Sequence, residues 1–188
     1  MKEEIPDGSL QANQEKLKRI KVIHGELLAQ QNLDAIVSFL TEDLSWGGPI
    51  NQKILTATNH QVDEHVLNTM PKLYPGDAFS TPAFGLPYKV LIFGMISKWD
   101  NNFSGGERFL KLSTIKALEI AAQLGCKRIG IPSFSPGPDK YPLRKSARIL
   151  FNALRDGPID AFESIELICK SDDAYDAFTE RFVAGGDD

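Results

Sequence analysis

Residues 126–154 read CKRIGIPSFSPGPDKYPLRKSARILFNAL and carry most of the information about the architecture. Residues 126–131 form an apolar run of strand length with a basic entry, Lys127 and Arg128. Residues 143–154 place apolar side chains at helical spacing. The loop between them, residues 132–142, holds four prolines and one glycine. In open α/β sheets, ligands bind at such loops, beyond the carboxyl ends of strands and beside helix N-termini. The alternative is that this loop is only a stiff connector.

The bulk composition describes one ordinary globular domain. The chain has 188 residues, of which 42% are hydrophobic and 24% charged, and its formal net charge is -4. The absence of a basic patch argues against nucleic-acid binding. No apolar run approaches the ~20 residues of a membrane span, and residues 1–8 lack the apolar core of a signal peptide. We therefore expect a cytoplasmic protein that binds neither nucleic acid nor membrane.

The cysteines and histidines do not point to a metal or a cofactor. Cys126 and Cys169 lie in separate apolar segments, which favours two buried thiols rather than a disulfide. His24, His60 and His65 show no metal-ligand spacing with them. We predict no metal site and no cofactor.

Strands alternate with helices along the rest of the chain. The expected strands are residues 19–24, 34–40, 78–83, 88–96, 126–131 and 164–169; the expected helices are residues 49–58, 61–70, 107–124, 143–154 and 171–182. The run 34–40 is nearly all apolar, which is typical of a strand buried on both faces. This order predicts an α/β fold, a three-layer α/β/α sandwich with a mixed, mostly parallel central sheet.

The domain organisation is equally simple. We predict an N-terminal extension over residues 1–18, a single domain over residues 19–183, and a flexible tail over residues 184–188. The chain shows neither an internal repeat nor a linker long enough to separate two domains.

Several segments, taken in order, resemble macro domains. Residues 34–37, DAIV, followed by the loop with Gly47 and Gly48, resemble that family's D-A-I-V-N-A-A-N strand and its glycine-rich first ligand loop. Residues 131–142 resemble its second loop, I-P-x-x-S-T-G-x-Y-G-Y-P, and residues 25–27 are similar to its G-D-I. The resemblance covers roughly residues 19–182.

Macro domains bind ADP-ribose or related nucleotides, and some hydrolyse ADP-ribosyl groups. The resemblance implies a small-molecule ligand held in a cleft between the two loops. The positions that it matches to ligand-binding positions are Glu26, Thr41, Trp46, Gly47, Gly48, Ile50, Ser135, Pro136, Gly137, Pro138, Asp139 and Tyr141.

Departures from the family pattern argue against hydrolysis. The family's asparagine associated with catalysis falls at Thr41, and its catalytic aspartate falls at Asn51, which cannot act as a base at neutral pH. We therefore name no catalytic residue. The aspartate that holds the adenine amino group falls at Glu26, which is either a longer substitute for it or a solvated glutamate.

Both loops also lose features that suit a phosphate. Pro49, Pro136 and Pro138 carry no backbone N–H, and Asp139 brings a negative charge toward a site meant for phosphates. Trp46 replaces the first glycine of the first loop and is either a stacking platform or a plug of the pocket; packing is the more common role of such a residue.

Two hypotheses about function follow. The first is a module that binds ADP-ribose or another nucleotide-like or acidic metabolite. The second is a degenerate scaffold that binds no nucleotide and acts through its surface on a protein partner.

Overall fold

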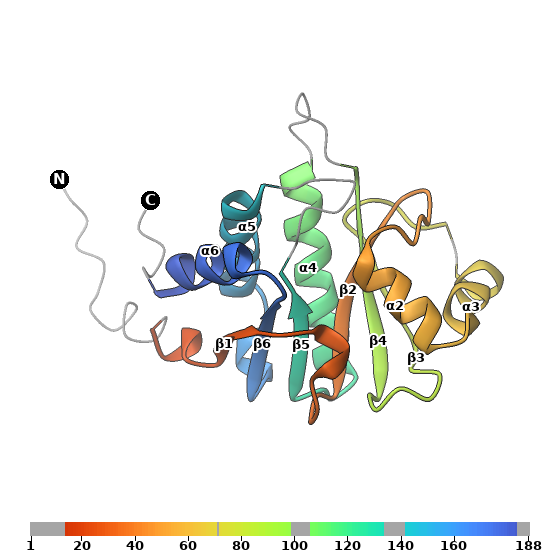
Figure 1. The fold of residues 1–188 in the computed structure, drawn as a ribbon, viewed down its shortest axis with the longest axis horizontal. Coiled ribbons are helices and arrows are strands. Elements are labelled where there is room, and N and C mark those ends of the chain that lie inside the picture. The colour runs from red at the N-terminus through yellow and green to blue at the C-terminus, as the bar shows by residue number, and fades with distance from the viewer. Residues whose placement is uncertain (1–13, 71, 99–105, 134–141, 184–188) are drawn as a thin grey trace.

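The computed structural model describes residues 14–70, 72–98, 106–133 and 142–183. Six strands in these ranges form one sheet in the order β1-β6-β5-β2-β4-β3 (Figure 1). They are β1 (Ile20–His24), β2 (Ala35–Thr41), β3 (Ala78–Pro82), β4 (Val90–Ile96), β5 (Arg128–Pro132) and β6 (Ser164–Cys169). Neighbouring strands are parallel except β3, which runs antiparallel to β4. The mixed, mostly parallel sheet is confirmed.

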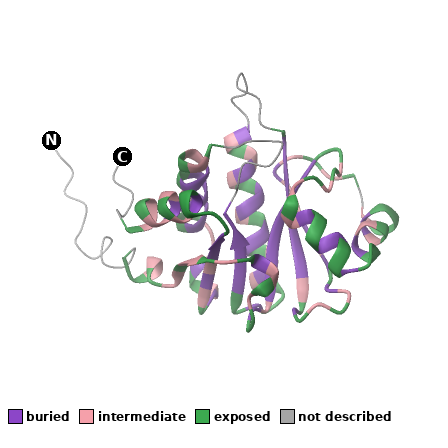
Figure 2. Ribbon diagram, viewed as in Figure 1, coloured by how far each residue is buried: buried purple, intermediate pink, exposed green. Residues whose placement is uncertain are grey.

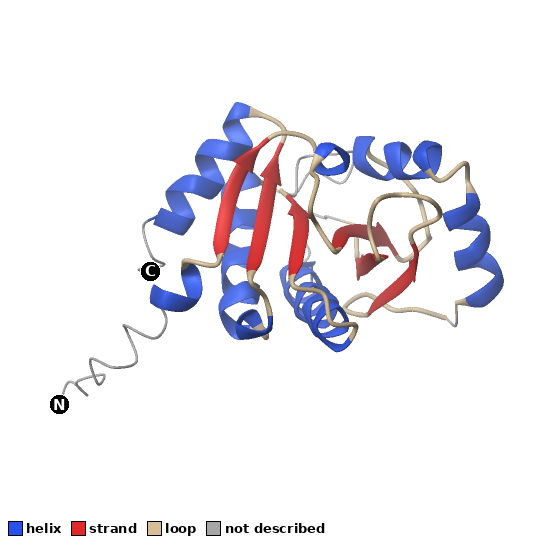
Figure 3. Ribbon diagram, turned by 90° about the horizontal axis from the view of Figure 1, so that it is seen from below, coloured by secondary structure: helices blue, strands red, loops and turns tan. Residues whose placement is uncertain are grey.

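Helices cover both faces of this sheet (Figures 1 and 3). They are η1 (Leu27–Ala29), α2 (Pro49–Ala57), α3 (Gln61–Thr69), α4 (Gly106–Gln123), α5 (Leu143–Asp156), η2 (Ile159–Ala161) and α6 (Asp172–Val183). One face packs against η1, α2 and α3, and the other against α4, α5 and α6. The predicted three-layer α/β/α sandwich is therefore confirmed, with element ends that differ from the expected ones by one or two residues.

The helices that the structure describes include none with the length and apolar character needed to cross a bilayer.

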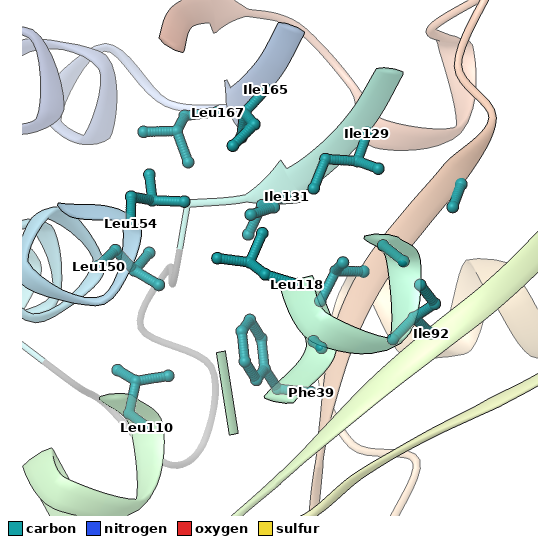
Figure 4. Close-up of a cluster of buried hydrophobic side chains, with 14 of the residues drawn as sticks. Phe39, Ile92, Leu110, Leu118, Ile129, Ile131, Leu150, Leu154, Ile165 and Leu167 are labelled. Atoms are coloured by element: carbon teal, nitrogen blue, oxygen red, sulfur yellow. The ribbon is translucent and has the colours of Figure 1, made fainter. Parts of the chain in front are cut away.

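The central strands are buried on both faces because each faces a helical layer (Figure 2). Every residue of β2 is buried, as the apolar run 34–40 predicts. Alternate side chains enter opposite layers: Val37 and Phe39 join the cluster under α4, α5 and α6, while Ile36 and Leu40 join the cluster under α2 and α3. Figure 4 shows the first cluster, with Phe39 beside side chains of α4 and α5.

Local signals in the sequence set several element boundaries. The Ser171 Oγ accepts a hydrogen bond from the backbone N–H of Ala174 at 3.2 Å, which caps α6 as expected. Gly125 follows α4 with a φ of 72°, the left-handed conformation that suits a helix C-terminus. Pro82 ends β3, which lies at an edge of the sheet, where a missing N–H breaks no ladder.

The pairing between β2 and β5 is short. In the described strands it comprises two positions, Ala35 with Ile129 and Ile36 with Gly130. Beyond them β2 continues along β4 as far as Thr41, and β5 continues along β6 as far as Pro132. The two halves of the sheet are thus joined at the amino ends of these strands and are not paired at the carboxyl ends.

Gly94 in β4 provides a test of the packing between β2 and α4. A Cβ added there would lie 2.9 Å from Cδ1 and Cε1 of Phe39 and 3.1 Å from the Ser113 Oγ. The Phe39 ring is only 6% exposed and has little room to move. We expect Gly94→Ala to lower the free energy of unfolding by about 1–3 kcal/mol, measured by urea denaturation.

A double mutant supplies the control. Gly94→Ala should lower the free energy of unfolding by less in a Phe39→Leu background than in the unchanged protein. The smaller leucine side chain would leave room for the new methyl group. Strictly additive effects of the two substitutions would contradict this account of the contact.

Candidate functional site

A cleft lies at the carboxyl ends of β1, β5 and β6, next to the first turn of α2. Its volume, open mouth included, is about 540 Å³. The described residues that line it are Gly25, Glu26, Leu27, Leu28, Pro49, Ile50, Lys53, Ser133, Ile168 and Lys170. Carboxyl ends of parallel strands are where open α/β sheets bind their ligands.

The floor of the cleft is apolar and tightly packed. Leu27, Leu28, Ile50 and Ile168 form most of it. It closes over β5 because Gly130 has no side chain: a Cβ there would lie 2.7 Å from Leu33 Cδ1, 3.0 Å from Ile168 Cδ1 and 3.3 Å from Leu27 Cδ1. The floor can therefore hold a flat apolar group but offers it few hydrogen bonds.

The rim of the cleft is charged. Glu26 follows β1, and its Oε2 lies 2.6 Å from Lys53 Nζ of α2, while its Oε1 lies 3.2 Å from Lys170 Nζ, which follows β6. The hydrogen bond to Lys53, with that to Lys170 second, holds the pKa of the Glu26 carboxyl below its usual value. The same contact raises the pKa of Lys53. The two ammonium groups and the one carboxylate together carry one net positive charge.

Asn51, in the first turn of α2, is a structural residue. It is buried, and its Oδ1 accepts a hydrogen bond from the Ser38 Oγ at 2.7 Å. Its Nδ2 donates to the carbonyls of Phe39 at 2.8 Å and Gly47 at 3.3 Å. One amide side chain thus joins the middle of β2, the glycine loop and α2.

Thr41 is engaged in the turn that follows β2. Its Oγ1 donates to Asp43 Oδ1 at 2.6 Å, and the same carboxylate oxygen accepts the backbone N–H of Ser45 at 3.0 Å. Lys98 Nζ lies 2.8 Å from Asp43 Oδ2. The Lys98 ammonium, followed by the Thr41 hydroxyl, lowers the pKa of Asp43 to about 2.

The glycine loop leads directly into α2. Gly48 is the residue before the helix and has a φ of 87°, a conformation that suits glycine, and Pro49 occupies the first turn, as expected. The half-buried Trp46 packs edge-on against Phe93, with ring centroids 5.3 Å apart. Trp46 is not among the described residues that line the cleft.

The structure thus brings together part of the predicted site. Glu26 and Ile50 line the cleft and Gly48 adjoins it, whereas Thr41 and Trp46 are held by other contacts. The second-loop positions Ser135, Pro136, Gly137, Pro138, Asp139 and Tyr141 lie outside the described residues.

Sequence reasoning missed both lysines at the rim. Lys53 lies one helical turn after Ile50 and Lys170 follows the last strand directly. The rule that ligands bind at the carboxyl ends of strands would have identified these positions.

Comparison with known proteins agrees with the fold. The Macro domain family model matches residues 37–150. A macro domain-containing protein of Cupriavidus necator is 25% identical over 169 residues, which cover 87% of this chain and 97% of the relative. A second one, from Lactiplantibacillus plantarum, is 26% identical over 168 residues, covering 88% of this chain and 96% of its own.

Solved structures share the architecture at lower identity. The Oceanobacillus iheyensis macrodomain with ADP is 20% identical with a TM-score of 0.76, covering 88% of this chain and 90% of its own. The Trypanosoma brucei macrodomain in complex with ADP-ribose is 21% identical with a TM-score of 0.74, and the match covers 86% of this chain and 68% of its own. The macro domain of ganglioside induced differentiation associated protein 2 is 17% identical with a TM-score of 0.79, and the match covers 90% of this chain and 86% of its own.

The contacts of Asn51 predict the effect of replacing it. In Asn51→Asp, a carboxylate with no N–H would face the carbonyls of Phe39 and Gly47, so we expect a loss of about 2–3 kcal/mol in the free energy of unfolding. Chemical denaturation at pH 7 measures it. Asn68→Asp, on the exposed surface of α3, is the matched control and should change the free energy by less than about 0.5 kcal/mol. Equal effects of the two changes would disprove the structural role.

The lowered pKa of Asp43 predicts part of the loss of folding stability at acid pH. Its pKa is about 2 in the fold against an ordinary 3.8, so its stabilising contribution is complete above about pH 4 and is lost as the pH falls through 2. The side chain is 45% exposed, and solvent screening limits the contribution to about 1 kcal/mol or less. Asp43→Asn should remove this part of the pH dependence in unfolding measurements between pH 5 and 2. An unchanged pH profile would contradict the assignment.

Proposed function

This chain belongs to the macro domain family, and we propose that it binds ADP-ribose or a related nucleotide-like metabolite in the cleft at the carboxyl ends of β1, β5 and β6. The observation that carries the proposal is the composition of that cleft. An apolar floor, a charged rim and the first turn of a helix meet in one concave site, and a nucleotide offers a partner to each of them.

The apolar floor suits a nucleobase. Leu28 and Ile50 are partly exposed above the buried Leu27 and Ile168, and they present aliphatic surface on which a flat ring can lie. The first turn of α2, at Pro49 and Ile50, brings the positive end of a helix dipole to the same cleft, which favours a phosphate. Pro49 contributes no N–H to such a phosphate.

Related folds support a ligand of this class. The macrodomain of Oceanobacillus iheyensis was solved with ADP and that of Trypanosoma brucei with ADP-ribose, and both share the architecture of this chain.

The proposal is for binding and does not include hydrolysis. Asn51 stands where the family's catalytic aspartate falls, and its amide is fully engaged with Ser38, Phe39 and Gly47. Thr41, at the position of the asparagine associated with catalysis, donates its hydroxyl hydrogen to Asp43. Neither residue offers a base to a ligand.

A calorimetric titration with ADP-ribose tests the proposal. We expect a dissociation constant in the micromolar range and at least tenfold weaker binding for Ile50→Glu, which places a carboxylate on the apolar floor. Leu124→Glu is the matched control: Leu124 is 48% exposed beyond the end of α4, and its replacement should leave the affinity unchanged.

The alternative function predicts the opposite result. If the chain is a scaffold without a nucleotide, the titration gives no heat at millimolar ADP-ribose, and the proposed function fails. Equal weakening by the two glutamate substitutions would likewise show that the cleft is not the site.

A further inference from the structure

Three charged side chains from separate parts of the chain converge at the rim of the cleft. Glu26 follows β1, Lys53 lies on α2, and Lys170 follows β6. Each carboxylate oxygen of Glu26 meets one ammonium, Oε2 that of Lys53 and Oε1 that of Lys170. Two cations thus face one anion on a chain whose net charge is -4.

We propose that Lys53 and Lys170 bind a phosphate monoester of the ligand, and that the Glu26 carboxylate occupies this position when no ligand is bound. The inference rests on the proposed function and narrows it: the preferred ligand is a nucleotide-like metabolite that carries a phosphate monoester in addition to its diphosphate.

The charges of the three groups and their numbers of hydrogen-bond donors and acceptors favour this exchange. An ammonium has three N–H donors, and each lysine donates to Glu26 through one of its contacts. A phosphate monoester carries a charge of about -1.5 to -2 and three acceptor oxygens, so it matches two ammonium groups better than one carboxylate does. The ligand would replace a monoanion by a stronger acceptor without leaving either lysine unpaired.

The accessibility of the cluster makes the exchange easy. The side chains of Lys53, Glu26 and Lys170 are 44%, 47% and 59% exposed, so a ligand can reach them from the mouth of the cleft. Ion pairs between exposed side chains are weak, and the Glu26 contacts can be given up at little cost.

The proposed position lies beyond the first turn of α2, where the proposed function places a phosphate. Lys53 lies about one helical turn beyond Ile50, and one turn advances roughly 5 Å along the axis. Asp172, an acidic residue close to Lys170 in sequence, has its Oδ1 3.3 Å from His24 Nε2. A phosphate at the start of α2 and a phosphate monoester at the two lysines would therefore occupy successive positions along the rim of the cleft.

Paired titrations test the inference. ADP-ribose and its 2′-phosphate differ by one phosphate monoester, and we expect the phosphorylated compound to bind at least tenfold more tightly to the unchanged protein in low salt. The preference should disappear in Lys53→Gln and in Lys170→Gln. Lys116→Gln, which breaks a comparable surface pair with Asp77 at 2.8 Å, is the control and should retain it.

Glu26→Gln gives the sharpest result, because the exchange predicts a gain. Without the competing carboxylate the two lysines are free for the phosphate, so affinity for the 2′-phosphate should rise by at least threefold. A carboxylate that accepts a hydrogen bond from a base amino group would instead make the same variant bind both compounds more weakly. That outcome, or equal affinity of the unchanged protein for the two compounds, overturns the inference.

A probe without a nucleotide separates this inference from the proposed function. Inorganic phosphate, followed by NMR chemical shifts, should perturb residues 26, 53 and 170, and the perturbation should saturate at lower phosphate concentration in Glu26→Gln. If neither ADP-ribose nor its 2′-phosphate binds but inorganic phosphate perturbs these residues, the proposed function fails and the anion site at the two lysines is retained. If ADP-ribose binds and phosphate leaves these three residues unperturbed, the anion site fails alone.

Discussion

The fold depends on the way Asp34 joins the two halves of the sheet. Its Oδ2 accepts the backbone N–H groups of Lys127 and Arg128 at 2.7 and 3.1 Å, its own N–H donates to the Arg128 carbonyl at 2.7 Å, and its carbonyl accepts the N–H of Lys89 at 2.8 Å. These bonds hold the starts of β2, β4 and β5 in register. Because they lie at the amino ends of the strands, β2 and β5 are free to separate at their carboxyl ends, on the side of the sheet where the cleft lies.

A second polar anchor holds the middle of β2. Asn51 ties the strand to the glycine loop and to α2, so this helix begins at a fixed place beside the cleft. Pro49 and Ile50 on one wall and Lys53 on the rim all belong to α2. One buried amide side chain therefore positions several residues that line the cleft. This gives a physical reason for an asparagine where a charged carboxylate would be costly to bury.

Local sequence patterns were sufficient to predict the layers of the fold, but they were not sufficient to predict the candidate site. The apolar run 34–40 predicted a strand buried on both faces, and Ser171, Gly125 and Pro82 marked element ends by short-range chemistry. The rim cluster depends on pairing between distant segments: β1 and β6 run parallel, with His24 opposite Cys169, and this register brings Glu26 and Lys170 together. Such contacts leave no periodic trace in the sequence. The resemblance located Glu26 but gave no indication of the cations that surround it.

The two outer strands bear on how the protein behaves at high concentration. Both β1 and β3 have five residues; β1 carries the exposed Lys21, and β3 ends in Pro82. A strand from another molecule would gain few backbone hydrogen bonds at either edge of the sheet. It would also have to accommodate the Lys21 side chain along β1, or pair along β3 with Pro82, which has no backbone N–H. The sheet is thereby protected from growing by edge-to-edge addition, a common first step toward aggregation.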